Sequence, residues 1–286
     1  MIQKEKFIQK IISLEKNIKI SYYIHGEIMN EENLIKYYNK FNEDKRLTRR
    51  RGEVEFITSL KYIKEYLNPN DKIIDIGAGT GRYSIELEKL GYDVTAVELV
   101  KHNIKQIEQK SNTIKTILGN AINLKKIKDN TYDLTLLFGP MYHLITKEEK
   151  IQAIKKAKRK TKKDGIIMIA YCMNDYAIIQ HGFIDNNIKE AIKNNEINNS
   201  FHVSPKKTDL YSRLTLDEIN ELNKITNLKR IKIITPDGPT NYIRKTLNKM
   251  DDETFELFMK YHLSTCERMD LIGAAAHTLD ILKNDK

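Results

Sequence analysis

The chain has 286 residues, enough for one large domain or for one domain with an accessory part. Its 40% hydrophobic and 31% charged residues, with only 12 glycines and 5 prolines, are typical of a soluble globular protein and exclude a disordered or fibrous one. The apolar runs reach strand length but fall far short of the ~20 residues of a membrane span. The lysine-rich N-terminus lacks the apolar centre of a secretory signal, so we expect a cytoplasmic protein.

A formal charge of +10 raises the question of a nucleic-acid partner. The lysines are spread over most of the chain, however, and only the stretch "DKRLTRRRGE" at 44–53 is dense. A solvated basic surface is therefore the favoured interpretation, and a nucleic-acid face is the alternative. Cys172 and Cys266 are too few and too far apart for a disulfide framework or a zinc site, and the seven histidines form no metal-ligand spacing.

Helical periodicity marks the chain up to residue 67. Apolar faces within 7–12, 34–41 and 56–67 predict three amphipathic helices, and "NPND" ends the last of them. The helix that follows the first strand has Tyr83, Leu87 and Leu90 on its predicted apolar face.

Strand-like and helix-like segments alternate from 53 to 171. The predicted strands are "KIIDIG", "DVTAVEL", "KTILGN", "YDLTLLFGP" and "GIIMIAYCM". Successive βαβ units place helices on both faces of a parallel sheet, because the crossovers are right-handed. The expected fold class is a doubly wound α/β sheet of Rossmann type, mostly parallel and seven-stranded.

The later part of the chain is less regular. It predicts a helical insertion at 173–209, a helix at 215–225, a strand at 228–238, helices at 240–266 and a last strand at 275–283. We expect a helical lid at 1–52, a core at 53–172, a substrate cap at 173–209, and the rest of the core sheet at 210–286 with its own insertion at 240–266.

Three glycines follow the first strand of the core. Gly77, Gly79 and Gly81 have the spacing GxGxG, one residue tighter than the dinucleotide-binding GxGxxG. Glu98 ends the second strand, where a carboxylate takes ribose hydroxyls. Asp75 repels a pyrophosphate but suits a ligand that carries an ammonium and a sulfonium. S-adenosylmethionine (SAM) has these groups and no phosphate.

The motifs "DIGAGTG", "VTAVEL", "LGNA" and "FGPMYHL" resemble the first four motifs of the class I SAM-dependent methyltransferases, over residues 53–171. The resemblance implies SAM as cofactor and S-adenosylhomocysteine (SAH) as its product. It implies a cofactor site of Asp75, Gly77, Ala78, Gly79 and Gly81 around the methionine part, Glu98 at the ribose, Leu99, Asn120 and Ala121 at the adenine, and Phe138 and Gly139 beside the methyl. Asn120 stands where the family often has Asp.

Tyr142 and His143 come just after the fourth strand, at the edge where doubly wound sheets bind ligands. Both are candidate catalytic residues, with His143 as a general base, and simple packing of His143 is the alternative. "FGPMYHL" differs from the (D/N)PP(Y/F/W) motif of enzymes that methylate amino groups of bases, which argues against that substrate.

Residues outside the core are candidates for binding the methyl acceptor. Arg49, with Arg50 and Arg51, is suited to a carboxylate or phosphate. The other candidates are Tyr37, Tyr38, Tyr176, His181, Tyr242, Arg244 and Arg268. Plain helix packing or solvation is the alternative for each.

We therefore expect a SAM-dependent methyltransferase that acts on an oxygen, nitrogen or acid group of a small molecule, as a monomer or homodimer, without metal or membrane. An RNA methyltransferase is the alternative function. A nicotinamide-dependent oxidoreductase and a non-catalytic SAM-binding module are alternatives of other classes.

Overall fold

The computed structural model describes residues 34–36, 49–206 and 209–286. The helix predicted within 7–12, most of the one predicted within 34–41, and the candidates Tyr37 and Tyr38 lie outside the described residues. The lid assigned to 1–52 therefore stays a prediction, as does the division of the chain into lid, core and cap.

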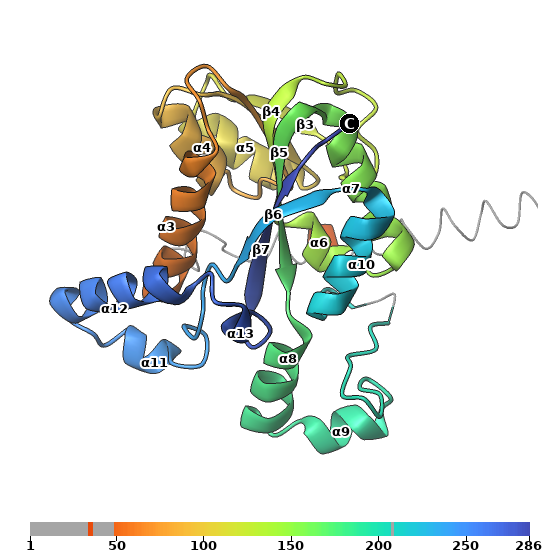
Figure 1. Cartoon of the computed structure of the whole chain (residues 1–286), viewed down its shortest axis with the longest axis vertical. Coiled ribbons are helices and arrows are strands. Elements are labelled where there is room, and N and C mark those ends of the chain that lie inside the picture. The colour runs from red at the N-terminus through yellow and green to blue at the C-terminus, as the bar shows by residue number, and fades with distance from the viewer. Residues whose placement is uncertain (1–33, 37–48, 207–208) are drawn as a thin grey trace, which may run out of the picture.

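A seven-stranded sheet forms the centre of the molecule, with the strand order β3-β2-β1-β4-β5-β7-β6 (Figure 1). Neighbouring strands from β3 to β5 are parallel, whereas β7 runs antiparallel to both β5 and β6. The strands are β1 Lys72–Ile76, β2 Asp93–Glu98, β3 Lys115–Leu118, β4 Tyr132–Leu137, β5 Thr161–Cys172, β6 Lys229–Ile234 and β7 His277–Lys283. The predicted doubly wound, mostly parallel sheet is confirmed.

Helices cover both faces of this sheet, so the central strands are apolar on both sides. On β1, Ile73 packs in the cluster that holds Leu87 and Ile107, while its neighbour Ile74 packs in the cluster that holds Ile154. The main covering helices are α3 Arg50–Glu65, α4 Arg82–Lys89 and α5 Lys101–Lys110 on one face, with α7 Lys147–Lys160 and α10 Leu216–Thr226 on the other.

The remaining helices occupy the connections near the ends of the strands, and all of them except α12 (Asp252–Thr265) are short. They are α6 Pro140–His143, α8 Asn174–Ala177, the π-helix Ile178–Ile184, α9 Ile188–Lys193, α11 Arg244–Leu247, α12 Asp252–Thr265 and α13 Met269–Ile272. In Figure 1, α8 and α9 continue below β5, and α11 and α12 extend to the side of α3. Among the described residues, no helix is both long and apolar enough to cross a bilayer.

One detail of the predicted helix faces is wrong. Leu90 is 45% exposed, because α4 ends at Lys89 and Leu90 is already its C-terminal cap. The residues that α4 buries completely are Ser84 and Leu87. The buried face of α4 therefore includes a polar side chain, Ser84, which contacts Asp75 of the first strand.

Candidate functional site

A cavity of about 470 Å³ opens at the carboxyl ends of the parallel strands. We call its two parts the glycine-loop half and the aromatic half. The glycine-loop half comprises Asp75, Gly77, Ala78, Gly79, Thr80, Glu98, Leu99, Val100, Asn103, Asn120, Ala121, Ile122, Phe138 and Gly139. The aromatic half comprises Tyr142, His143, Leu144, Cys172, Met173, Tyr176, His181, Tyr211, Arg213, Asn241, Arg244, Ala276, His277 and Arg51.

The glycine loop turns sharply out of β1. Gly77 and Ala78 both donate their amides to the carbonyl of Val97 on β2, at 2.8 and 3.1 Å. Gly77 has φ +78°, and a Cβ there would lie 2.4 Å from Cδ of Pro140. Gly139 is constrained less severely, since its Cβ would lie 3.0 Å from the carbonyl oxygen of Gly77. Glycine is required because the loops after β1 and β4 touch backbone to backbone.

The other two glycines of the loop have different surroundings. Gly79 has φ +56°, and a Cβ built on it meets nothing within 4 Å, so this position faces open space. Gly81, with φ +85°, caps the N-terminus of α4 and its Cβ would lie 2.8 Å from Cγ1 of Ile107. Gly81 is not part of the cavity lining. Its conformation serves the packing of α4 on α5.

Asp75 is a buried acid at the floor of the cavity, with 2% of its surface exposed. Ser84 of α4 donates its hydroxyl to Oδ2 of Asp75 at 2.7 Å. Burial raises the pKa of Asp75 to about 6, against the opposing effect of the Ser84 hydrogen bond. Among the described residues, no positively charged side chain contributes to the pKa shift of Asp75.

Glu98 is the second buried acid of the glycine-loop half. Its Oε2 accepts the amide of Gly79 at 2.9 Å, and its Oε1 accepts the amide of Val100 at 2.9 Å and the side chain of Asn103 at 3.3 Å. Burial raises the pKa of Glu98, although these hydrogen bonds act to lower it. Asn103 was not predicted, although its place in the first turn of the next helix is a usable signal.

Asn120 and Ala121 line the side of the same half, after β3. The side-chain oxygen of Asn120 accepts the amide of Ile122 at 3.1 Å, and its carbonyl accepts the amide of Asn123 at 2.9 Å. Asn120, which the resemblance places at the adenine, therefore stabilises its own turn with its side-chain oxygen.

α6 carries the two candidate catalytic residues from the end of β4 into the aromatic half. Nδ1 of His143 donates to the carbonyl of Leu210 at 2.6 Å, and the His143 ring lies 5.2 Å from that of Tyr211. The amide of Ser212 donates to the carbonyl of Tyr142 at 2.6 Å. The segment 209–213 thus closes one side of the cavity and fixes the orientation of the His143 ring.

The structure brings only some of the other candidates to the cavity. Tyr176, His181, Arg244 and Arg51 line it. Tyr242 lies behind Tyr176, with ring centroids 5.2 Å apart, and donates its hydroxyl to the carbonyl of Ala274.

Three predicted arginines are not part of the cavity lining. Arg49 precedes α3, Arg50 pairs with Asp252 at 2.7 Å, and Arg268 pairs with Asp270 at 2.6 Å.

His277 is the main residue that the sequence analysis missed. Its Nδ1 lies 2.8 Å from Oδ2 of Asp237, an acid that follows β6 and is 1% exposed. Because β7 is antiparallel to β5, its first residue lies at the edge where the parallel strands end, and His277 pairs in register with Cys172. Sequence reasoning predicted the strand but not its direction.

A mostly parallel sheet with one antiparallel strand next to last, and a ligand cavity at its carboxyl edge, is the architecture of the class I SAM-dependent methyltransferases. Residues 74–169 match the family model described as a methyltransferase domain. This part of the chain is therefore a methyltransferase domain, and SAM is the cofactor of its class.

Known proteins agree with this assignment. "Putative methyltransferase YqeM" of Bacillus subtilis is 28% identical over 111 residues, which are 38% of this chain and 45% of that protein. The ribosomal RNA small subunit methyltransferase A of Wigglesworthia glossinidia brevipalpis is 33% identical over 95 residues, 30% of this chain and 36% of that protein. The chain thus spans less than half of the length of these curated relatives.

A SAM-dependent methyltransferase structure from Methanosarcina mazei superposes with a TM-score of 0.53 at 15% identity, over 78% of this chain and 96% of the other. At this identity the likeness shows the fold alone.

The residues of the glycine-loop half fit SAM. Two buried carboxylates with raised pKa values favour a ligand that brings positive charge, as the ammonium and sulfonium of SAM do. Asp75 and the glycine loop would hold the methionine part, and Glu98 the ribose. Such a ligand supplies a methyl group already activated for displacement.

Proposed function

We propose that this protein transfers the methyl group of SAM to an oxygen, nitrogen or acid group of a small molecule. The observation that supports this most is the continuity of one cavity from the glycine-loop half, through Gly139, into the aromatic half. Its volume of about 470 Å³ lies in the range of pockets that hold a cofactor or a small ligand. A cofactor in the first half leaves the second half for the acceptor.

The chain's part in such a transfer is alignment, exclusion of water and removal of a proton. The acceptor's lone pair forms the new bond to carbon as the old carbon–sulfur bond breaks. Because Nδ1 of His143 donates to Leu210, the neutral ring presents Nε2 as its proton acceptor. We assign to this nitrogen the proton that a hydroxyl or amine acceptor loses, whereas a carboxylate acceptor needs no base.

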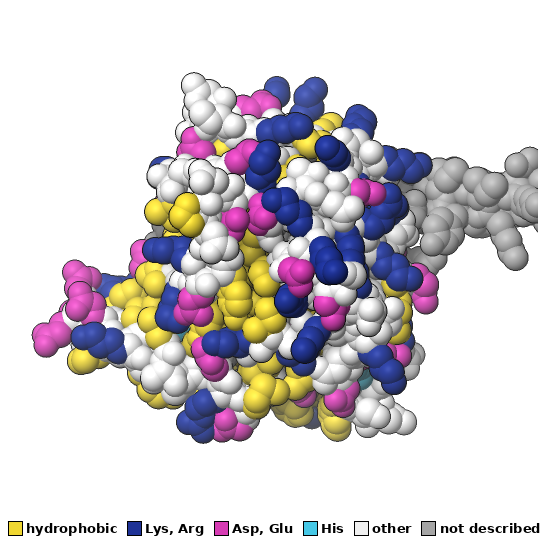
Figure 2. All heavy atoms as spheres, turned by 45° about the horizontal axis from the view of Figure 1, so that its top comes forward, with side chains coloured by type: hydrophobic (Ala, Val, Ile, Leu, Met, Phe, Trp, Pro, Cys, Tyr) yellow, Lys and Arg dark blue, Asp and Glu magenta, His cyan; other side chains and the backbone are white. Residues whose placement is uncertain are grey.

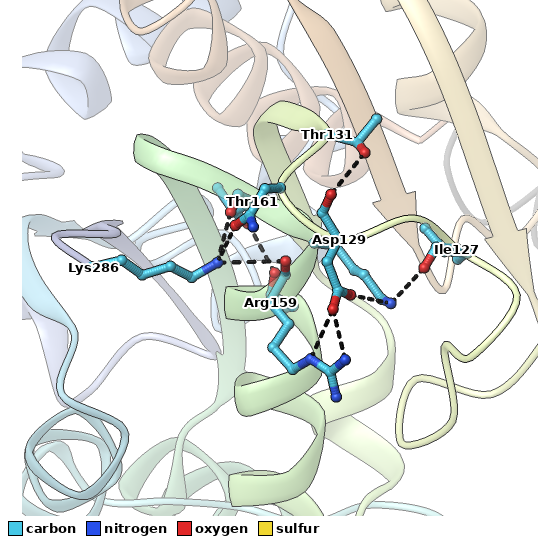
Figure 3. Close-up of polar contacts among 9 residues, drawn as sticks. Ile127, Asp129, Thr131, Arg159, Thr161 and Lys286 are labelled. Carbon is cyan, nitrogen blue, oxygen red and sulfur yellow. Dashed lines mark hydrogen bonds and ion pairs between the residues drawn. The ribbon is translucent and has the colours of Figure 1, made fainter.

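An RNA acceptor is the alternative that the charge of +10 and the ribosomal RNA relative suggest. One group of basic residues lies at the starts of β4 and β5, the edge of the sheet opposite to the cavity (Figure 3). There Lys160 and Arg159 bind Asp129, each at 2.6 Å, and Lys286 donates to the carbonyl of Thr161 at 3.0 Å. These charges stabilise the turns before the strands.

The surface at that edge of the sheet also carries basic and acidic side chains mixed together. Figure 2 brings this edge toward the viewer and shows Lys and Arg side chains spread over it, with acidic side chains between them. A surface of mixed sign supports solvation better than it supports a track for a phosphate backbone. The volume of the cavity, which suits a small ligand, and this dispersed charge together favour the small-molecule acceptor.

Calorimetry with SAH, followed by a transfer assay, tests the proposed function. We expect SAH to bind, and Glu98→Gln to weaken its binding at least tenfold because one ribose acceptor is lost. Asp93→Asn is the matched control, since Asp93 lies at the other end of β2 and pairs with Lys72 at 3.4 Å. Labelled SAM is then offered with phenols, carboxylic acids, amines, tRNA and ribosomal RNA.

The outcomes separate the alternatives. Transfer of the labelled methyl group to a small molecule supports the proposal. Transfer to RNA alone shows instead that the protein is an RNA methyltransferase. Binding of SAH without transfer to any acceptor indicates a non-catalytic module. If NADH raises the melting temperature and SAH does not, the site belongs to an oxidoreductase.

A further inference from the structure

The aromatic half of the cavity is rich in cationic side chains. Arg51, Arg213, Arg244 and His277 contribute to its lining. We call these four residues the cationic wall. They come from α3, from the segment before α10, from α11 and from the start of β7, so folding brings together charges that are far apart in the sequence.

The acids of the lining lie elsewhere or already have partners. Asp75 and Glu98 belong to the glycine-loop half. Glu149 caps α7, where its Oε2 accepts the amides of Ile145 and Thr146 at 3.0 and 2.9 Å. Glu55 lies on α3 and acts on the pKa of Tyr83. Asp237 offsets the charge of His277 and Glu55 offsets one arginine, so the remaining arginines leave the aromatic half with a net positive charge.

A chain of hydrogen bonds holds two members of the cationic wall in place. Asp237 accepts from the His277 side chain at 2.8 Å and from the His277 amide at 3.2 Å. Asn241 donates its side-chain amide to Asp237 at 2.8 Å and accepts from Nη1 of Arg51 at 3.2 Å. Because Asp237 is buried and bound on several sides, the His277 ring is fixed rather than loosely placed.

The charge on His277 follows from the same contacts. Burial acts to lower the pKa of His277, but the charge and hydrogen bond of Asp237, together with Cys172, outweigh it and raise that pKa well above its ordinary value. An imidazolium donates from both nitrogens. His277 is therefore a cation paired with the buried Asp237 and with Cys172 beside its ring, and it adds positive charge to the lining next to the arginines.

Aromatic rings lie beside these charges. The ring of Tyr142 is 5.3 Å from that of His277. The pKa of Tyr176 is raised by burial and by Asp237, while His277, Arg244 and Arg51 act to lower it, which places Tyr176 among the same charged groups. Flat apolar surface and positive charge meet in one place.

We infer, resting on the proposed function, that the methyl acceptor carries an anionic group, a carboxylate or a phosphate, which His277, Arg244 and Arg213 bind while Tyr142 and Tyr176 pack against a planar part of the molecule. Arginine and imidazolium donors are suited to such an anion. An acceptor whose only charge is positive meets like charges in this half and is disfavoured.

Calorimetry on the protein saturated with SAH tests this inference with three probes of similar shape: benzoate, phenyl phosphate and the neutral benzamide. We expect the two anions to bind at millimolar concentrations, at least tenfold more tightly than benzamide, and more weakly as salt is raised. The stronger of the two anions identifies the group.

Variants assign the effect to residues. His277→Gln and Arg213→Gln are each expected to weaken the anions fivefold or more and to leave SAH binding unchanged. Arg244→Gln does the same without a risk to folding, because Arg244 is exposed on a short helix. Lys245→Gln, the next residue and also exposed, is the matched control and should change nothing.

Two results overturn the inference. One is that benzamide binds as tightly as the anions, or that neither anion binds the SAH complex. The other is that anion binding is the same in Arg244→Gln and Lys245→Gln. Failure of SAH itself to bind is a separate result, which removes the proposed function instead.

Discussion

The two halves of the cavity are built in different ways. The glycine-loop half comes from the stretch 75–139, and all of its residues except Asn103 of α5 lie at the end of a strand or in the loop after it. The aromatic half combines five separated segments, around Tyr142, Tyr176, Tyr211, Arg244 and His277, together with Arg51 of α3. The first half therefore depends on local backbone geometry, and the second depends on long-range packing.

The largest effect is expected from Gly77→Ala. A Cβ at Gly77 lies 2.4 Å from the Pro140 ring on a backbone with φ +78°, so the loops after β1 and β4 must separate. We expect a loss of stability of about 3 kcal/mol or more and no measurable SAH binding.

Gly91→Ala is the control for Gly77→Ala, because Gly91 also has positive φ, +92°, but open space around its Cβ. Gly91→Ala should lower the free energy of unfolding, measured by chemical denaturation, only by the backbone strain of about 1–2 kcal/mol. Equal costs for both variants contradict the close contact of the two loops.

Asp75→Asn should weaken SAH binding about 100-fold, because it removes a buried charge that would face the ammonium of the ligand's amino-acid part. The same change should stabilise the ligand-free protein at neutral pH. The folded pKa of about 6 lies above the ordinary 3.8, so the stability of the native protein falls as pH rises between these values, by up to about 3 kcal/mol.

Thermal unfolding of the ligand-free protein checks the stability effect of Asp75→Asn. The variant should gain little at pH 4 and its full advantage above pH 6. Asn still accepts the Ser84 hydroxyl, so packing is preserved. An advantage that does not depend on pH contradicts this explanation.

His143→Gln sharpens the distinction between the halves. We expect kcat to fall about 100-fold with a hydroxyl or amine acceptor, because the proton acceptor is lost, while the Kd for SAH stays the same. His102→Gln, on the exposed side of α5, is the control. A large change in SAH binding contradicts the assignment of His143 to the aromatic half, because it shows that His143 contributes to cofactor binding.

The pH dependence of SAM binding gives a smaller but diagnostic effect. A cationic ligand favours ionised Asp75, so its affinity should rise with pH, up to tenfold per unit below about pH 6, and level off above it. Calorimetry between pH 5 and 7.5 measures this. In Asp75→Asn the slope should shrink to the part due to Glu98, whose pKa is also raised by burial.

The smallest effect is expected from Arg268→Ala. Arg268 pairs with Asp270 on the surface, at 2.6 Å, and does not line the cavity. Surface pairs of this kind contribute about 0–1 kcal/mol. SAH binding, transfer and stability should all stay close to those of the native protein, and a tenfold loss of transfer restores Arg268 as a candidate.

The sequence predicted the sheet well because buried parallel strands have short apolar sequences, and these are separated by segments with helical periodicity. It also indicated Asp75 and Glu98, because strand ends and glycine spacing are local features. It could not indicate His277, whose partner Asp237 is 40 residues away and whose position depends on the direction of β7. The contact of His143 with Leu210, 67 residues away, has no local signal either.

The position of β7 in the sheet determines the order in which the two halves of the cavity can form while the chain is being synthesised. β6 is synthesised before β7, and among the described strands it pairs with β7 alone. A nascent chain that ends before His277 already contains every element of the glycine-loop half, yet β6 has no strand to pair with among those described. The ability to hold a nucleoside should therefore emerge during translation before the ability to recognise an acceptor.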